Sequence, residues 1–329
     1  MAYSPNPATG STNTGNLALA QAAYDRLARF ALRPELYFDQ VADIKPTNQS
    51  MPGSSVTFPI VSDLAIASSA LNESTDVTPQ AISESNVTVT LAEYGNAVLT
   101  TAALRGESYV EIDPIVANVV GYNAGVSIDE VARDVLKAGT NVAYAGTATS
   151  RATINSTQLL KASDIRAAKA RLRSQNVPNF NGFYTAYIHP NVAYDFTSET
   201  GSAAWRDPHT YSQPGEIWAG ELGAFEGFRF IETPRSPVFT GVGSSSSSGY
   251  APVYATLCVG RQSLAKAWSM VDGNTEQPHV VPGPITDFLR RFVPWGWYWL
   301  GGYSIYRQAS IQRIESGSSL TYSDPAIDQ

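Results

Sequence analysis

Apolar residues recur at steps of four and three over residues 113–139, which is the strongest periodic signal in the chain. The repeat comprises Val116, Val120, Ala124, Ile128, Val131, Val135 and Ala138. Asp113 suits a helix cap and Pro114 suits the first helical position. Lys137 and Gly139 suit the end of a helix, through the helix dipole and the left-handed conformation respectively. The pattern predicts one long helix over residues 113–139.

Two other stretches alternate apolar and polar side chains, which is typical of strands exposed on one face. The first carries Val56, Phe58 and Ile60, and the second carries Val87 and Val89. The sequence between them is long, polar and rich in Ser and Thr, so the two strands predict an extended hairpin loop. An isolated two-stranded hairpin is only marginally stable. The loop must therefore lie on its own body or on a neighbouring chain.

This loop is acidic. Residues 46–104 contain no Lys or Arg, and they include Asp63, Glu73, Asp76, Glu84 and Glu93. The most basic segment lies elsewhere, in a helix predicted over residues 163–175. It carries Arg166, Lys169, Arg171 and Arg173. We expect the acidic loop to lie near this basic helix of an adjacent subunit.

The N-terminal residues 1–15 are rich in Pro, Asn, Thr and Gly, and they predict an extended arm. Asn16 can cap a helix that follows, and Pro34 ends it. Apolar residues recur at helical spacing between them: Leu17, Ala20, Tyr24, Leu27 and Ala31.

The second half of the chain mixes helix and strand patterns. Strands are predicted at 183–188, 227–231, 251–259, 295–300 and 304–314, and the Ser-rich stretch 243–249 predicts a surface loop. Together with the hairpin and the long helix, this order predicts an α+β protein with a mixed α/β body.

Composition limits the classes of function. Only 16% of the 329 residues are charged and the net charge is −7. Few charges are consistent with a surface that is largely covered in use, and an acidic surplus argues against sequence-specific DNA binding. The single cysteine, Cys258, excludes an intramolecular disulfide and predicts a small buried side chain. The sequence shows no signal peptide, and its most apolar stretch, 294–303, is too short to span a membrane.

Candidate catalytic motifs are weak. His189, His209 and His279 have no metal-ligand spacing, and no G-x-S-x-G elbow or Walker motif occurs. Gly241-Val242-Gly243 begins like a dinucleotide loop but continues with serines. The carboxylates of Glu221, Glu226 and Glu232 lie in a Gly-rich turn-and-strand pattern, which favours a structural role.

Trp295, Trp297 and Trp299 fall on one face of a predicted strand. An aromatic platform for sugars or bases is one interpretation. Because the other face carries Tyr298 and Leu300, a strand buried on both faces is the interpretation we favour.

Five segments, in this order, resemble tailed-bacteriophage major capsid proteins of the Hong Kong 97 fold, in the enquatrovirus-like branch. They are LNE at 71–73, VTVTLAEYGNAVLT at 87–100, AGTNVAYAG at 138–146, YIHPNVAYDF at 187–196 and GELGAFEGFRFIETP at 220–234. The similarity extends over residues 16–270.

The resemblance implies a division of the chain. It comprises an N-terminal arm and helix at 1–45, an extended loop at 46–104, a peripheral domain at 105–149 and 271–329 with the spine helix, and an axial domain at 150–270. It also implies hexamers and pentamers that close an icosahedral head around double-stranded DNA, bound without sequence specificity. The portal protein is an implied partner, as are scaffolding and decoration proteins where they are used. The particle would assemble in the host cytoplasm, with no membrane, metal, cofactor or catalytic residue.

The residues expected at subunit interfaces are those of the loop strands, the loop acids and the basic helix. They are Val56, Phe58, Ile60, Glu73, Asp76, Glu84, Val87, Val89, Arg166, Lys169, Arg171 and Arg173. The type member of the fold cross-links its subunits through a loop lysine. The absence of lysine from this loop implies a non-covalent shell.

Two other functions stay open. An encapsulin-like nanocompartment shares the fold and would hold an enzyme cargo in place of DNA. A carbohydrate-binding or carbohydrate-hydrolysing β-rich protein would use the tryptophan strand at 295–299.

Overall fold

The computed structural model describes residues 37–46, 55–61, 64, 66–68, 70, 73–74, 76, 79–107, 112–199, 223–246, 249–269, 276–282, 287–289 and 291–320. The predicted N-terminal arm and its helix at 16–33 lie outside these residues, as do His209 and Glu221.

The first sheet is built around one long strand, β15 (Phe292–Ile305). Strand β4 (Ala92–Thr101) pairs antiparallel with its first ten residues, while β14 (His279–Pro282) and β13 (Leu264–Trp268) pair with it antiparallel as well. Strand β1 (Ala42–Pro46) is parallel to β13. The strand predicted at 295–300 is thus the middle of a fourteen-residue strand.

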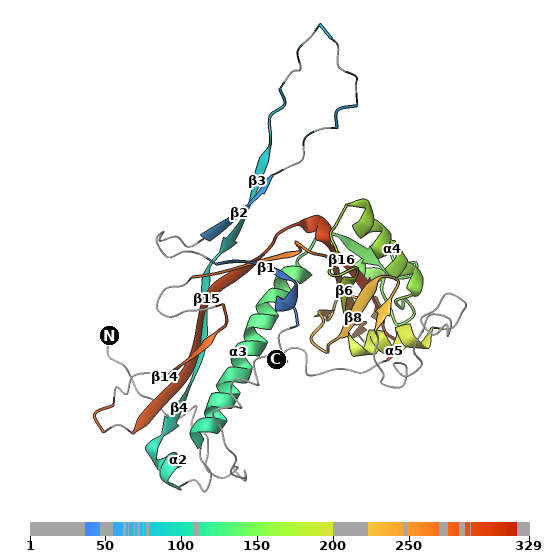
Figure 1. Cartoon of the computed structure of the whole chain (residues 1–329). Helices are drawn as coiled ribbons and strands as arrows, with labels where there is room; N and C mark the ends of the chain where they lie inside the picture. The colour runs from blue at the N-terminus through green and yellow to red at the C-terminus, as the bar shows by residue number, and fades with distance from the viewer. Residues whose placement is uncertain are drawn as a thin grey trace.

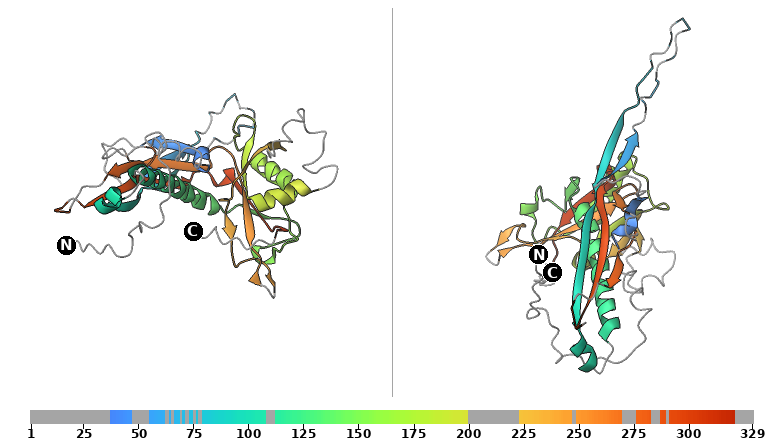
Figure 2. Two further views of the ribbon diagram at one scale, coloured as in Figure 1. Left: turned by 90° about the horizontal axis from the view of Figure 1, so that it is seen from below. Right: turned by 90° about the vertical axis from the view of Figure 1, so that its left-hand side faces the viewer.

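The predicted long helix is confirmed as α3 (Ile112–Lys137), which lies along the first sheet (Figures 1 and 2). Its apolar stripe packs on the β15 residues Trp297, Trp299 and Tyr303. The short helix α2 (Ala102–Glu107) precedes it, and Arg105 forms an ion pair of 2.6 Å with Asp113 across the turn.

The second sheet has the order β5-β16-β12-β6-β8-β7, with β9 beside β12. Their bounds are β5 Val142–Tyr144, β6 Tyr184–Ile188, β7 Ala224–Phe225, β8 Phe228–Glu232, β9 Val238–Phe239, β12 Val253–Val259 and β16 Ile311–Ser316. A 3-10 turn, η7 (Gln308–Ser310), separates β15 from β16. The prediction of one strand over 304–314 is therefore wrong, because the chain turns there from the first sheet into the second.

Helices α4 (Ala162–Ser174) and α5 (Pro190–Ser198) cover one face of the second sheet. The opposite face contributes Tyr187, Leu257, Val259 and Ile311 to the core that α3 shares with the first sheet. The long helix is thus packed against both sheets through one continuous apolar cluster. Further short elements are η3 (Asp39–Val41), η4 (Arg151–Thr153), and the strands β10 (Ser245–Ser246) and β11 (Gly249–Tyr250).

Strands β2 (Ser55–Val61) and β3 (Glu84–Thr90) pair antiparallel, which confirms the predicted hairpin. The pairing runs from Ser55 opposite Thr90 to Val61 opposite Glu84. Beyond this pair the loop projects away from the rest of the molecule, at the top of Figure 1 and in the right-hand view of Figure 2. We call its described residues from Val61 to Glu84 the distal loop, and the rest of the β2–β3 pair the loop base.

Candidate subunit interface

The loop base packs on its own subunit. Val56, Phe58 and Val89 are 8%, 6% and 0% exposed, and they form one cluster with Ala265 and Ala267 of β13. These three side chains were expected to face a neighbour, and this part of the expectation is corrected. The physical reason is that the small alanines leave a shallow surface under the hairpin, and the apolar face of the hairpin covers it.

Close contact between the loop base and the first sheet depends on one glycine. A Cβ placed on Gly302 of β15 would lie 2.1 Å from the carbonyl oxygen of Thr90. Aromatic side chains pack in the same region, where the ring centroids of Phe58 and Tyr306 lie 5.7 Å apart. Val87 is half-buried and packs on this cluster too, while Ile60 is half-buried at the start of the distal loop.

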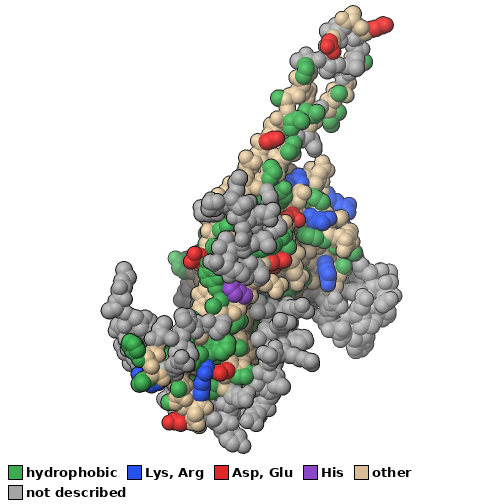
Figure 3. Space-filling model, turned by 60° about the vertical axis from the view of Figure 1, so that its left-hand side comes forward, with side chains coloured by type: hydrophobic (Ala, Val, Ile, Leu, Met, Phe, Trp, Pro, Cys, Tyr) green, Lys and Arg blue, Asp and Glu red, His purple; other side chains and the backbone are tan. Residues whose placement is uncertain are grey.

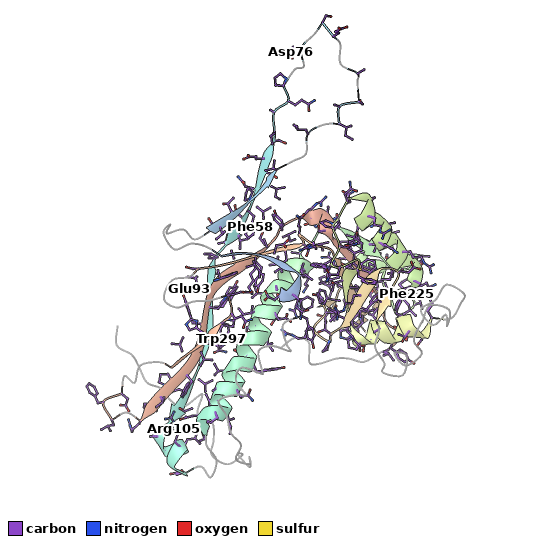
Figure 4. The ribbon with its side chains drawn as sticks, viewed as in Figure 1. Phe58, Asp76, Glu93, Arg105, Phe225 and Trp297 are labelled. Carbon is purple, nitrogen blue, oxygen red and sulfur yellow. The ribbon has the colours of Figure 1, made fainter. Side chains whose placement is uncertain are left out.

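The distal loop differs from the base because its apolar side chains are exposed. Val61, Leu64, Ile66 and Ile82 are 59%, 56%, 91% and 60% exposed. Figure 3 shows hydrophobic side chains along the projecting loop, and Figure 4 places Asp76 near its tip and Phe58 at its base. Large exposed apolar groups on a narrow projection are typical of a surface that a partner covers.

The acidic residues of the loop are also exposed. Glu73, Asp76 and Glu84 all belong to the exposed class. With no Lys or Arg in residues 46–104, the loop carries only negative charge. A cationic partner surface would complement it.

The basic helix α4 uses two of its four cations within the subunit. The Arg166 guanidinium donates to Glu226 at 2.8 Å, and the Lys169 ammonium lies 3.8 Å from the same carboxylate. Glu226 and Gly227 form a left-handed turn with φ of 51° and 83°, which directs the carboxylate toward α4. Glu226 therefore has a structural role, as its sequence setting predicted.

Arg171 and Arg173 lie in the last turn of α4 and are exposed. They are the residues of the predicted basic set that remain accessible for a partner.

A second exposed apolar feature lies between β14 and β15. Phe288 and Leu289 are fully exposed and 72% exposed, respectively. The sequence pattern does not distinguish them, because two adjacent apolar residues in a turn carry no periodic signal.

Buried charges, which were not predicted from the sequence, connect the first described residues to the body of the subunit. Asp39 lies 2.8 Å from the ammonium of Lys266, which is 1% exposed, and accepts a hydrogen bond of 2.7 Å from the Tyr303 hydroxyl. A lysine inside the apolar strand 264–268 was the available signal.

A second carboxylate fixes the same segment to α3. One oxygen of Asp129, which is 0% exposed, accepts from the backbone N–H groups of Tyr37 and Phe38, both at 2.9 Å. The other lies 3.1 Å from the Arg235 guanidinium. Burial raises the pKa of Asp129 to about 6, against the two backbone donors and the nearby arginine, which lower it.

The described residues contain no group of three or more metal-ligating side chains, and no helix among them is long and apolar enough to cross a membrane. Cys258 is buried, and burial raises the pKa of its thiol to about 12, so it is a poor nucleophile at neutral pH.

The tryptophan strand is part of the core. Trp297 and Trp299 are 5% and 0% exposed and pack against α3. The Trp297 indole donates to Asn123 of the helix at 2.8 Å. The interpretation of a buried strand is confirmed for these two residues.

A long helix packed on an elongated sheet, a second α/β layer and a projecting hairpin loop together define the Hong Kong 97-type capsid fold. Comparison with family models agrees, since residues 13–318 match the phage capsid protein family. The chain belongs to the phage capsid protein family, as a structural major capsid protein of a phage head.

Solved structures with the same fold include the capsid of Ralstonia phage GP4, with a TM-score of 0.72 at 14% identity, covering 98% of this chain and 99% of that one. The Cyanophage Pam1 capsid has a TM-score of 0.67 at 14% identity, over 97% and 99% of the two chains. The head structure of Helicobacter pylori bacteriophage KHP40 has a TM-score of 0.61 at 13% identity, over 95% and 97%. No curated protein sequence matches the chain.

Proposed function

We propose that this protein assembles into hexamers and pentamers that close an icosahedral head around double-stranded DNA, and that each distal loop lies across a neighbouring subunit. The observation that carries the proposal is the exposure of Val61, Leu64, Ile66 and Ile82 on a projection with no body beneath it. A loop of this kind gains its apolar contacts from another copy.

The energetics favour this arrangement. Burial of apolar surface contributes about 25 cal/mol per Å², so each of these side chains can supply on the order of 1 kcal/mol or more when a neighbour covers it. Exposed ion pairs contribute less, about 0–1 kcal/mol each. The contacts of one subunit are modest, but a closed shell repeats them in every copy.

Charge supports a particular orientation. The exposed loop acids Glu73, Asp76 and Glu84 complement the exposed Arg171 and Arg173 of α4 on an adjacent copy. Within the subunit, Arg166 and Lys169 already face Glu226, so they are weaker candidates for this contact.

A deletion tests the proposal. Removing residues 62–83 and joining Val61 to Glu84 with a short Gly-Ser turn preserves the β2–β3 pairing, which ends at these two residues. We expect a folded subunit with an unchanged thermal midpoint and no closed shells by electron microscopy. Normal shells from this deletion would contradict the proposal.

A matched pair of variants separates apolar contact from loop length. Replacing Val61, Leu64, Ile66 and Ile82 with serine should prevent assembly. A conservative set, Val61→Ile, Leu64→Ile, Ile66→Leu and Ile82→Leu, should preserve it. Equal assembly by both sets would show that the apolar side chains are not what the neighbour binds.

The remaining features of the proposal rest on sequence resemblance. They are the enquatrovirus-like branch, the division into arm, extended loop, peripheral and axial domains, the portal and other head partners, assembly in the host cytoplasm, and a role without enzymatic activity. The loop contains no lysine, so we also expect mature particles to give a single subunit band on a denaturing gel. Covalent ladders would contradict that expectation.

The encapsulin-like alternative is distinguished by content, because purified phage heads hold DNA and a nanocompartment holds an enzyme. The carbohydrate alternative has lost its main support, since Trp297 and Trp299 are buried against α3.

A further inference from the structure

Three cationic side chains surround the ring of Phe239 in β9. The guanidinium of Arg151 lies 3.6 Å from the ring centroid, the ammonium of Lys137 lies 4.9 Å from it, and the guanidinium of Arg313 lies 5.6 Å from it. The ring is half-buried, and the negative face of an aromatic ring attracts cations. We call Lys137, Arg151 and Arg313 the cation cluster.

The cation cluster is assembled from segments that are far apart in the sequence. Lys137 is the last residue of α3, Arg151 is the first residue of η4, and Arg313 lies in β16. The Arg313 guanidinium donates to the backbone carbonyl of Lys137, and the end of α3 lies beside β16 in Figure 1. The fold therefore fixes the backbone positions from which the three cations project.

One buried carboxylate, that of Glu315, offsets part of this charge. Its two oxygens accept hydrogen bonds from Arg151 at 2.6 and 2.8 Å, and one of them also accepts from Nε of Arg313 at 2.9 Å. Among the described residues, Glu315 is the only carboxylate within ion-pair distance of the cation cluster. The cluster therefore keeps an excess of two positive charges, in a chain whose net charge is −7.

Each cation also keeps a donor group that no described residue accepts from. These groups are the ammonium of Lys137, Nη1 of Arg151 and Nη2 of Arg313. The Arg151 side chain is 31% exposed and Lys137 is half-buried, so an anion can reach them from solution. Burial lowers the pKa of Arg313 and Glu315 raises it only in part, while the charge of Arg151 lowers it further. An anion held at these donors would stabilise the charged form of Arg313.

We propose that the cation cluster binds a phosphate group. An excess of two charges and three available donors match the charge and the terminal oxygens of a phosphate, whereas a carboxylate offers one charge and two oxygens. Arginine is also well suited to phosphate, because its planar guanidinium donates from several nitrogens. Free inorganic phosphate and the backbone of DNA are the two sources of this group. The site lies within one subunit and depends neither on the distal loop nor on shell assembly.

Calorimetric titration of inorganic phosphate into the full-length, unassembled subunit tests the proposal. Lys137→Gln removes one cation without taking a partner from Glu315, and it should weaken phosphate binding at least tenfold, because a charged hydrogen bond is lost. Lys137→Arg keeps the charge and should bind phosphate within about threefold of the unmodified protein. Lys161→Gln is the matched control, since Lys161 is exposed at the start of α4, and its affinity should be unchanged.

Further titrations identify the source of the group. If binding of a short DNA duplex also weakens in Lys137→Gln, the DNA backbone occupies the site, and if only phosphate binding weakens, the free ion does. Equal phosphate binding by the unmodified protein and Lys137→Gln would overturn the proposal, as would an equal loss in Lys161→Gln. Acetate that binds as tightly as phosphate would overturn the assignment to a phosphate group and would point to an acidic side chain of a partner.

A second measurement needs no substitution. Phenylglyoxal modifies accessible arginines, and peptide mass spectrometry measures the rate at each one. We expect saturating phosphate to slow the modification of Arg151 at least fivefold, because the bound ion covers its free nitrogen. The exposed Arg229 of β8 is the internal control, and its rate should not change. Equal rates at Arg151 with and without phosphate would contradict the proposal.

Discussion

The loop base and the distal loop are two parts of one hairpin, yet they differ in what stabilises them. In the base, Val56 and Phe58 are buried against Ala265 and Ala267 of the same chain. In the distal loop, Leu64 and Ile66 are exposed by more than half of their surface. Both parts carry large apolar side chains, so the difference in their exposure arises from what lies beneath each of them.

This comparison shows which contacts belong to folding and which to assembly. The base covers the edge region where β13, β15 and β3 meet, and it is part of the subunit core. The distal loop extends past that support and can bury its apolar side chains only on another molecule. The variants below should therefore divide into those that weaken the subunit and those that weaken only the shell.

The largest effect on the subunit is expected at the buried cation beneath the first sheet. Lys266→Met leaves Asp39 without its cationic partner, although the Tyr303 hydroxyl still donates to it, and breaking a buried pair costs about 4 kcal/mol of unfolding free energy. Urea denaturation measures this. The double variant Lys266→Met with Asp39→Asn should recover much of the loss. A double variant as unstable as the single one would show that the charge pair is not the cause.

Removal of the aromatic ring from the loop base should have the next largest effect. Phe58→Ala creates a cavity between β2 and Tyr306, and we expect a loss of about 3 to 4 kcal/mol in the unfolding free energy. If urea denaturation of the unassembled subunit showed no change, the base would not be part of the core.

The buried carboxylate on α3 should make stability depend on pH. Burial raises the pKa of Asp129 from 3.8 to about 6, so the folded state binds the proton more tightly than the unfolded chain. Raising the pH from about 4 to above 6 should therefore cost about 3 kcal/mol of stability through this group. Arg235 and Asp39 are the charged groups that face it.

The matched variant is Asp129→Asn, which keeps an acceptor for the backbone N–H groups of Tyr37 and Phe38. The stability of the unmodified protein relative to this variant should fall across that pH range. If the difference in unfolding free energy between the two proteins stayed constant with pH, the raised pKa of Asp129 would not contribute to folding stability.

The smallest effect on the subunit is expected in the distal loop. Ile66→Ser changes a side chain that is 91% exposed, so the unfolding free energy should stay within about 0.5 kcal/mol of the unmodified value. The same variant should raise the protein concentration needed for shell assembly. The reverse result, a weakened subunit with normal assembly, would remove the distinction between the two parts of the hairpin.

The sequence predicts the helices and strands better than it predicts what they pack against. The long helix was expected at 113–139 and is found at Ile112–Lys137, because its apolar stripe extends over seven turns. The two loop strands were also predicted. The surface on which the loop base packs was not predicted, because Ala265 and Ala267 are small residues that no periodicity distinguishes. They also lie more than 170 residues away in sequence.

The candidate interface could be predicted only in part for a similar reason. Alternation identified Val56, Phe58 and Val89 as one face of a ribbon, but the pattern is the same whether that face lies on its own chain or on a neighbour. Leu64, Ile66 and Phe288 belong to no periodic pattern in the sequence. They are identified as candidate contact residues only by their exposure in the structure. Buried Asp129 and Lys266 required long-range contacts that sequence spacing does not contain.

Hydrogen exchange of the backbone amides in the free subunit and in assembled shells tests the central claim most directly. We predict that amides in residues 62–83 exchange freely in the subunit and are protected at least tenfold in the shell, while those of β3 and β4 are protected in both states. Equal protection of residues 62–83 in the two states would contradict the claim that a neighbouring copy orders the distal loop.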